Sequence, residues 1–402
     1  MGGGLLQLVA YGAQDVYLTG NPQITFFKVV YRRHTNFAME AIQQTFNGNP
    51  GYGNTVTCQI SRNGDLINRM YLQVDIPAVA NGGTDEYVNY LGLRLLKNVV
   101  IEIGGQQIDK HYSDWMYIWN ELSLPIGKRY AYDKMVGKDG ADLATKETTL
   151  YIPLEFWFCR NVGLALPLIA LQYHEVKVKI EFEQKTNCVV NGTRGTTLED
   201  ISNVVDIKNV SLWVDYIFLD TDERRRFAQL SHEYLIEQLQ FTGTESLSDG
   251  SNRIKLNFNH PCKELVWVSK YVSADTREWY NYSASVGADA EKDGGNPFDD
   301  AILQLNGNDR FAVRKGSYFN LVQPFQHHTN VPNNAGINVY SFALKPEDHQ
   351  PSGTLNMSRI DTATLMVTAA SGTGTFSGIN IYAVNYNVLR ILSGMGGLAY
   401  SN

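Results

Sequence analysis

The sequence has few cysteines, few charged residues and no long apolar run. Its four cysteines among 402 residues are Cys58, Cys159, Cys188 and Cys262. They are widely spaced and form no C-x-x-C pair, which argues against a zinc site and favours free thiols in a reducing compartment. The longest apolar run, residues 162–171, contains Pro167 and is too short to span a bilayer. No basic leader precedes the short apolar run at residues 5–11, so no secretory signal is expected.

Charge excludes a further class of protein. Charged residues make up 19% of the chain and the formal net charge is -7. A protein that binds nucleic acid through its phosphates would present a net basic face, so direct nucleic-acid binding is not expected. Two local basic clusters remain, Arg32-Arg33 and Arg224-Arg225-Arg226. They are either solvated charge with acidic neighbours such as Asp220, or contacts for an acidic partner or an anionic surface.

Motifs of catalysis and cofactor binding are also missing. The sequence contains no G-x-S-x-G, no H-E-x-x-H, no P-loop and no dinucleotide fingerprint. His327 and His328 are adjacent, so on a strand they would point to opposite faces and could not readily share a metal; a loop position is expected for both. Glycoside hydrolysis needs one carboxyl group as acid and a second as base or nucleophile. Loop carboxylates are plentiful, but the sequence does not indicate which two would lie together. We therefore expect no enzyme activity, no catalytic residue, no cofactor and no metal.

Alternation of apolar and polar residues dominates what is present. Residues 176–182 are the clearest case, because their apolar and charged side chains strictly alternate. Turn dipeptides at Asn63-Gly64, Gly104-Gly105 and Asn306-Gly307 separate such segments. With 23 tyrosines and 35 glycines, the chain has the composition of an all-β protein with large contact surfaces. The pattern predicts antiparallel sandwiches.

The second part of the chain repeats the first. Four segments recur in the same order: 56–60 with 254–258, 69–74 with 263–268, 100–110 with 303–311, and 214–216 with 384–386. One domain present twice explains this order, and a length of 402 residues suits two domains.

Helical signals are few. Residues 221–228 predict a short helix capped by Asp220 or Thr221, between the two copies. Residues 113–122 predict a second helix, whose aromatic side chains are expected to pack on a sandwich. Polar insertions at 125–149, 183–208, 270–300 and 323–336 are expected to form loops, which gather at the ends of a sandwich.

Four sequons for asparagine glycosylation occur in the chain. Asn209 and Asn356 lie in or beside predicted strands, whereas Asn191 and Asn281 lie in predicted loops. The two loop positions are therefore the candidates for modification.

Several stretches resemble the major capsid proteins of large eukaryotic DNA viruses, and above all those of chlorella viruses. They are residues 12–28, 60–66, 164–176, 214–220, 241–243, 309–312, 340–346 and 393–400. The likeness covers nearly the whole chain and fails mainly in the long loops. The sequence is thus identified as a member of this family or a close paralogue.

The resemblance implies an all-β double jelly roll, two tandem eight-stranded antiparallel sandwiches with a few short helices in loops. The implied division is an N-terminal arm (1–24), jelly roll 1 (25–219), a linker helix (220–228) and jelly roll 2 (229–402).

It further implies a homotrimer whose six barrels form a pseudo-hexameric capsomer in the icosahedral shell of a virion assembled in the host cytoplasm. Expected partners are further copies of the chain, neighbouring capsomers and minor capsid proteins. An internal membrane is a further partner, reached through the arm or through a basic face of Arg32, Arg33, Arg224, Arg225 and Arg226.

The resemblance also implies glycans on outer loops at unusual sequences, as in a close relative of this family. One such sequence resembles residues 53–57, which adds Asn54 to Asn191 and Asn281 as a candidate for glycosylation. A virion-surface, glycan-binding jelly roll, similar to a lectin, is the alternative function.

Overall fold

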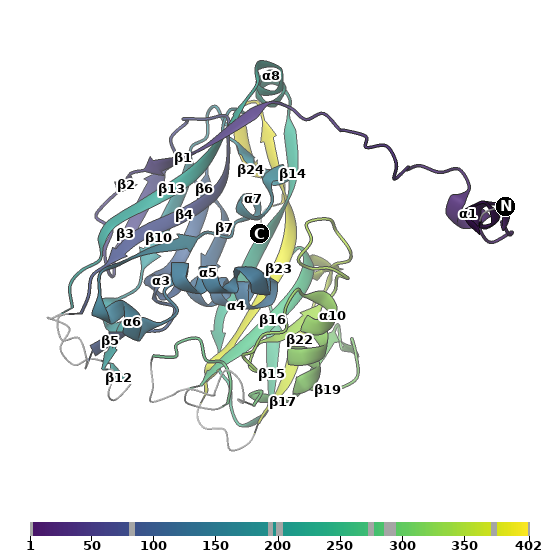
Figure 1. The fold of residues 1–402 in the computed structure, drawn as a ribbon. Coiled ribbons are helices and arrows are strands. Elements are labelled where there is room, and N and C mark those ends of the chain that lie inside the picture. Colours follow the sequence, from purple (N-terminus) through teal and green to yellow (C-terminus); the bar gives the residue numbers. More distant parts are fainter. Residues whose placement is uncertain are drawn as a thin grey trace. The chain divides into compact units, whose positions relative to one another are not determined.

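The computed structural model describes residues 3–79, 85–191, 196–197, 204–271, 277–284, 295–370 and 376–400. The chain divides into two compact units, residues 1–36 and residues 37–402. In the first unit, the described residues form two short helices, α1 (Gly3–Val9) and α2 (Val16–Thr19), and are otherwise irregular. The second unit contains all the described strands (Figure 1).

Two antiparallel sheets form the first half of the second unit. The β4 sheet has the order β1-β13-β4-β8, and the β6 sheet has the order β3-β10-β6-β7. Their strands are β1 (Phe37–Gln44), β3 (Thr55–Gln59), β4 (Leu66–Ile76), β6 (Leu96–Ile103), β7 (Gln106–Tyr112), β8 (Thr148–Pro153), β10 (Val176–Phe182) and β13 (Lys208–Leu219). Short strands add to them: β2 (Phe46–Asn47), β9 (Leu166–Pro167), and a small separate sheet of β5 (Asp85–Tyr87), β11 (Val189–Asn191) and β12 (Thr196–Thr197).

The second half repeats this arrangement strand for strand. The β16 sheet has the order β14-β23-β16-β20, and the β17 sheet has the order β15-β22-β17-β18. Their strands are β14 (His232–Glu245), β15 (Gly250–Leu256), β16 (Pro261–Tyr271), β17 (Phe298–Leu305), β18 (Asn308–Asp309), β20 (Asn338–Ser341), β22 (Ala363–Ala369) and β23 (Phe376–Leu392), with the short β19 (Arg314–Lys315), β21 (Leu355–Asn356) and β24 (Met395–Leu398) at their edges. Each half is an eight-stranded jelly roll, so the predicted fold class and duplication are confirmed.

Both predicted helices are present. α4 (Ser113–Ser123) follows β7, and α8 (Thr221–Gln229) lies between β13 and β14. At the start of α8, an Asp220 side-chain oxygen accepts a hydrogen bond from the Thr221 backbone N–H at 2.7 Å. Among the described residues of the second unit, the other helices are α3 (Leu91–Leu95), α5 (Ile126–Val136), α6 (Gly140–Thr145), α7 (Trp157–Arg160), α10 (Gln323–His327), η1 (Val162–Leu164), η2 (Lys185–Asn187), η3 (Tyr318–Val322) and η4 (Met357–Arg359).

The prediction of plain loops was therefore wrong in part. The insertion at 125–149 holds α5 and α6, and the insertion at 323–336 begins with α10. These helices are short and rich in polar residues, so their helical period is weak in the sequence, and contacts with the sheets stabilise them instead. The insertions at 183–208 and 270–300 lie partly outside the described residues.

Two of the three predicted turns join adjacent strands. Gly104-Gly105 joins β6 to β7, and Asn306-Gly307 joins β17 to β18; all four residues have positive φ, from 50° to 83°. Two consecutive positive φ values produce the turn that matches the twist of a hairpin. Asn63-Gly64 differs, because it connects β3 of one sheet to β4 of the other. The dipeptide marks a turn there, but not a hairpin.

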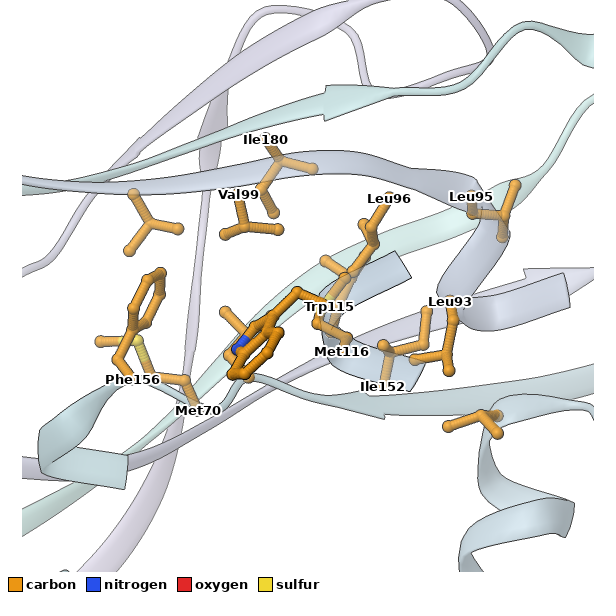
Figure 2. Packing of buried hydrophobic residues seen from close by; sticks show 14 of the residues in the cluster. Met70, Leu93, Leu95, Leu96, Val99, Trp115, Met116, Ile152, Phe156 and Ile180 are labelled. Atoms are coloured by element: carbon orange, nitrogen blue, oxygen red, sulfur yellow. The ribbon is translucent and has the colours of Figure 1, made fainter. Parts of the chain in front are cut away.

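The first half has its core between the β4 and β6 sheets. Met70 on β4 and Ile152 on β8 face Val99 and Ile180 from the opposite sheet, and Trp115 of α4 enters the same cluster (Figure 2). Strand β10 alternates between buried and partly exposed residues along its whole length, as its sequence predicts. Burial of these side chains is the main stabilising contribution, at roughly 25 cal/mol per Å² of apolar surface.

The β16 sheet differs because both of its faces are buried. Leu265 and Trp267 of β16 pack in the core of the second half, whereas Val266 and Val268 pack in the cluster that includes the first-half core. A strand buried on both faces shows a continuous apolar run in place of alternation. For this reason the sequence alignment of 69–74 with 263–268 pairs equivalent strands, but it pairs core-facing residues of one strand with outward-facing residues of the other. Met70 and Leu72 point into their own core, while their counterparts Glu264 and Val266 point away from theirs.

The first described strand, β1, begins at Phe37. Residues 25–36 precede it and belong to the first compact unit, together with residues 1–24. Apolar side chains of this unit are highly exposed, Phe26 at 85% and Phe27 at 97%.

Candidate functional site at the junction between the two halves

An aromatic segment of the second half packs against α4 of the first. The Tyr280 ring stacks on Tyr117 with 4.6 Å between ring centroids, and its hydroxyl lies 2.5 Å from Ser113 Oγ. Two residues further on, the Tyr282 hydroxyl donates a hydrogen bond to Asp114 Oδ1 at 2.8 Å. Both tyrosines are almost fully buried. Residues 277–284 therefore fasten the second jelly roll to a helix of the first.

Two cations flank an indole in the same segment. The Arg94 guanidinium lies 3.5 Å from the centroid of the Trp279 ring, and the Lys270 ammonium lies 3.9 Å from it. Each cation has a carboxylate partner, Glu183 at 2.9 Å from Arg94 and Asp114 at 2.9 Å from Lys270. Largely desolvated cation–π contacts of this kind stabilise by about 2 kcal/mol.

A buried ion cluster forms a second link between the halves. Glu237 of β14 accepts hydrogen bonds from Arg160 of α7 and from Lys263 of β16, both at 2.7 Å, and Lys263 also donates to the Pro346 carbonyl oxygen at 2.6 Å. The side chains of Glu237 and Lys263 are 5% and 1% exposed. Burial alone would raise the pKa of Glu237, but Arg160, His349 and Lys263 together lower it to about 2. Glu237 is therefore ionised at any physiological pH.

His328 follows α10 outside any helix or strand, as expected, and its side chain is buried between two carboxylates. Its Nε2 lies 2.8 Å from Glu264 Oε2 and its Nδ1 lies 2.8 Å from Glu347 Oε1. Burial by itself would lower the pKa of His328, but the two carboxylates outweigh it and raise the pKa to about 9. Through its two ring nitrogens, the imidazolium links Glu264 of β16 to Glu347, which follows β20. Its neighbour His327 instead hydrogen-bonds through Nδ1 to the Leu344 carbonyl oxygen at 3.0 Å.

A cavity of about 430 Å³ borders the ion cluster and is lined by residues of both halves. Cys159 lies in its wall, and burial raises the pKa of this thiol well above its usual value, so it is protonated and a poor nucleophile. Arg160 and Glu237, also in the wall, neutralise each other. The Arg160–Glu237 ion pair links α7 of the first half to β14 of the second.

Metal ligands and membrane spans are not found in the described part of the chain. Within those ranges, no three His, Cys, Asp or Glu side chains are grouped so that they could hold a metal ion. Among the same residues, every helix is too short or too polar to cross a bilayer. All four cysteines are free thiols.

The basic residues singled out from the sequence lie in both compact units. Arg32 and Arg33 belong to residues 1–36 and are exposed. On α8, Arg224 pairs with Asp65 at 2.8 Å and Arg226 pairs with Glu223 at 3.1 Å, as the local-partner interpretation predicts. Arg225 is exposed, and no described residue forms an ion pair with it. Arg225 is thus the arginine of α8 most available to another molecule.

The three candidate asparagines differ in access. Asn54 is exposed immediately before β3, and its side-chain amide donates to the Asn49 carbonyl oxygen at 3.1 Å. Asn191 is half-buried at the end of β11. Asn281 is only 8% exposed, and its Oδ1 accepts a hydrogen bond from the Ser283 backbone N–H at 2.9 Å. Solvent exposure makes Asn54 the most accessible of the three for glycosylation, although it lies directly before a strand and outside the long loops.

Sequence reasoning missed the junction itself. Arg160, Glu237 and Lys263 lie far apart in the chain, and no spacing rule brings them together. The one available signal was the apolar run from Leu265 to Val268, which lacks alternation and therefore indicates a strand with two buried faces.

Comparison with known proteins covers both halves. Residues 25–220 match a family described as "Major capsid protein N-terminus", and residues 223–397 match one described as "Large eukaryotic DNA virus major capsid protein". The major capsid protein of Pyramimonas orientalis virus is 55% identical, over 100% of both chains. That of Paramecium bursaria Chlorella virus 1 is 49% identical, again over 100% of both chains.

Solved structures agree with the sequence comparisons. The crystal structure of VP54 of PBCV-1 matches with a TM-score of 0.82 and 45% identity, covering 94% of this chain and 100% of that one. The Faustovirus major capsid protein matches with a TM-score of 0.76 at 15% identity, covering 95% of this chain and 94% of that one, which shows the fold alone. The matches lie with capsid proteins and lend no support to the lectin-like alternative.

Proposed function

The chain belongs to the major capsid protein family of large eukaryotic DNA viruses, and from this premise we propose that its working unit is a homotrimer that forms a pseudo-hexameric capsomer. The protein is a structural component of the virion capsid. In the trimer, two jelly rolls from each of three copies present six similar sides to the neighbouring capsomers.

One observation carries this proposal: the two halves have the same strand order in both of their sheets. Six nearly equivalent units can surround a three-fold axis only if each chain supplies two of them in a constant relation. The buried junction, with its ion cluster and the stacked Tyr280, provides that constant relation.

Light scattering on the purified protein tests the trimer. The expected mass is three times that of the 45.1 kDa chain. A folded protein that stays monomeric at micromolar concentration would refute the trimer as the working unit. Because the trimer requires large interfaces, its mass should change little upon moderate dilution.

We further propose that the N-terminal arm (1–24), or the basic residues Arg32, Arg33, Arg224, Arg225 and Arg226, contact minor capsid proteins or the surface of an internal membrane. Residues 16–39 contain no Asp or Glu but include Lys28, Arg32 and Arg33, in a chain whose net charge is -7. Exposed aromatic and basic residues together suit an anionic surface. Flotation with anionic vesicles tests the membrane contact, which should weaken in Arg32→Glu/Arg33→Glu. Binding that is insensitive to this change would contradict it.

A further inference from the structure

Within one chain, a helix of the first half packs on the outer face of a sheet of the second half, that is, the face turned away from the sheet's own core. The helix is α4, which lies in the connection between β7 and β8, and the sheet is the β16 sheet (Figure 1). The Trp115 ring of α4 lies 5.5 Å from the Tyr382 ring of β23. Just before α4, Tyr112 meets Phe241 of β14 at 5.0 Å. Tyr382 is only 1% exposed as a result.

The corresponding connection of the second half, between β18 and β20, also holds helical turns, η3 and α10. Their outward side chains are not covered by any described residue to a comparable degree: Leu321 is 51% exposed and Phe325 is 79% exposed. The two residues are four apart and so share a helix face. Leu344, 72% exposed, is adjacent, because its carbonyl oxygen bonds to His327 at the end of α10. We name Leu321, Phe325 and Leu344 the α10 patch.

The sheet of the first half that corresponds to the β16 sheet is the β4 sheet. Its outer face carries three aromatic side chains on adjacent strands. Tyr71 of β4 lies 6.1 Å from Tyr151 of β8 and 6.4 Å from Trp213 of β13, the latter pair with nearly parallel rings. Their sequence neighbours point into the core, so these three point outward. Tyr151 is 39% exposed, in contrast to Tyr382 on the β16 sheet. We name Tyr71, Tyr151 and Trp213 the β4 aromatic face.

The internal repeat thus leaves one exposed apolar surface on each half, and each is the counterpart of a surface buried at the internal junction. We propose that the α10 patch of one copy packs on the β4 aromatic face of a second copy, as α4 packs on the β16 sheet within the chain. The contact joins two different surfaces, so it continues from copy to copy, and under the three-fold rotation of the proposed trimer it closes into a ring. It deepens the proposed function and rests on the trimer proposed above, in which such contacts alternate with the internal junctions.

Changing Phe325 to Asp tests the contact. The substitution places a charge where the proposal buries an aromatic ring, so light scattering should show monomers at concentrations where the unmodified protein is a trimer. Val162→Asp is the matched control, since Val162 is 63% exposed and belongs to neither surface, and it should remain trimeric. Circular dichroism should be unchanged in both, because both side chains are exposed in the subunit.

Cross-linking identifies the receiving surface independently of stability. A photoreactive benzophenone side chain at position 325 should give a product of twice the subunit mass. Mass spectrometry should locate the attachment in β4, β8 or β13 of the other copy. Attachment to the second half of the other copy would overturn the proposal, as would a Phe325→Asp variant that remains a trimer. A monomeric unmodified protein would instead refute the trimer itself, so the two failures are distinguishable.

Discussion

At the scale of single residues, almost completely buried charges join the two halves. Lys263 is 1% exposed and would be costly to bury alone, because an ammonium loses its hydration. Glu237 and the Pro346 carbonyl oxygen replace that hydration, and Arg160 completes the set from the first half. Such a cluster contributes little net stability compared with apolar packing. We expect it to fix how the two jelly rolls meet.

Removing one cation from the cluster should destabilise the protein, because it leaves the charge of Glu237 buried with less compensation. Lys263→Met leaves Glu237 buried with one cation fewer, and the free energy of unfolding should fall by about 3–5 kcal/mol. Lys97→Met is the control: Lys97 pairs with Glu181 at 2.6 Å but is 54% exposed, so its loss should cost about 1 kcal/mol or less. Chemical denaturation compares the two. Equal losses would show that burial does not decide the effect.

His328 predicts a dependence of stability on alkaline pH. Its pKa is about 9 in the folded protein, against an ordinary value of 6.5. A group whose folded pKa is raised stabilises fully below its unfolded pKa and loses this contribution as pH rises through the folded value. Stability should therefore decline between pH 6.5 and about 9, by up to about 3 kcal/mol. Thermal unfolding midpoints across this range measure the decline. In His328→Gln the slope should flatten, and an unchanged slope would assign it to another group.

At the scale of elements, the two halves use the same hairpin with different surroundings. Gly104 in the first half and Asn306 in the second hold the same turn position, with φ of 59° and 50°. Asn tolerates this left-handed conformation better than other residues that have a side chain. What distinguishes the two turns is packing, because a Cβ on Gly104 would approach the His174 ring, with ring atoms within 3 Å.

This difference predicts an asymmetry between matched substitutions. Gly104→Asn should destabilise by about 1–3 kcal/mol although asparagine serves at the equivalent position, because His174 must move and release its hydrogen bond with Gly396. Asn306→Gly, the reverse change in the second half, should cost only about 1 kcal/mol, because it removes the hydrogen bond that Asn306 Oδ1 accepts from the Thr362 backbone N–H at 3.0 Å but displaces no neighbour. Chemical denaturation of both variants gives the two unfolding free energies to be compared. A harmless Gly104→Asn would show that the His174 contact is easily relieved.

At the scale of the whole molecule, the second half relies on the first. The outer face of the β16 sheet carries Val266, Val268 and Tyr382, all buried only because α4 and its neighbours cover them. An uncovered apolar face of this size associates non-specifically. The first half would expose less apolar surface without the second, because the outer face of its β4 sheet has polar residues such as Gln73 and Asp75 among its aromatics.

Separate expression of the halves tests this dependence. Residues 229–402 alone should be largely insoluble or bind a hydrophobic dye, whereas residues 37–219 should remain more soluble. Co-expression should rescue the second half, because the junction buries its exposed face. Soluble yield and dye fluorescence are the measurements. A second half that is soluble and folds cooperatively by itself would contradict the dependence.

The sequence by itself determined the fold class, the duplication and the two helices at α4 and α8. These follow from local rules: strands show their period of two, turns their glycines, and helices their caps and spacing. The family followed from extended stretches of resemblance and agrees with the comparisons. Strand existence was predictable even in the β16 sheet, since β16 and β23 are rich in branched and aromatic residues.

Only the tertiary structure decided which faces are buried and which charges meet. Strand β16 is apolar on both faces, so its sequence could not say which residues face its own core, and the predicted register between the repeats was displaced for that reason. Arg160, Glu237 and Lys263 meet because two sandwiches pack together, and His328 is buried because Glu264 and Glu347 flank it. Long-range contacts of this kind depend on how sheets pack, and no local pattern of residues encodes them.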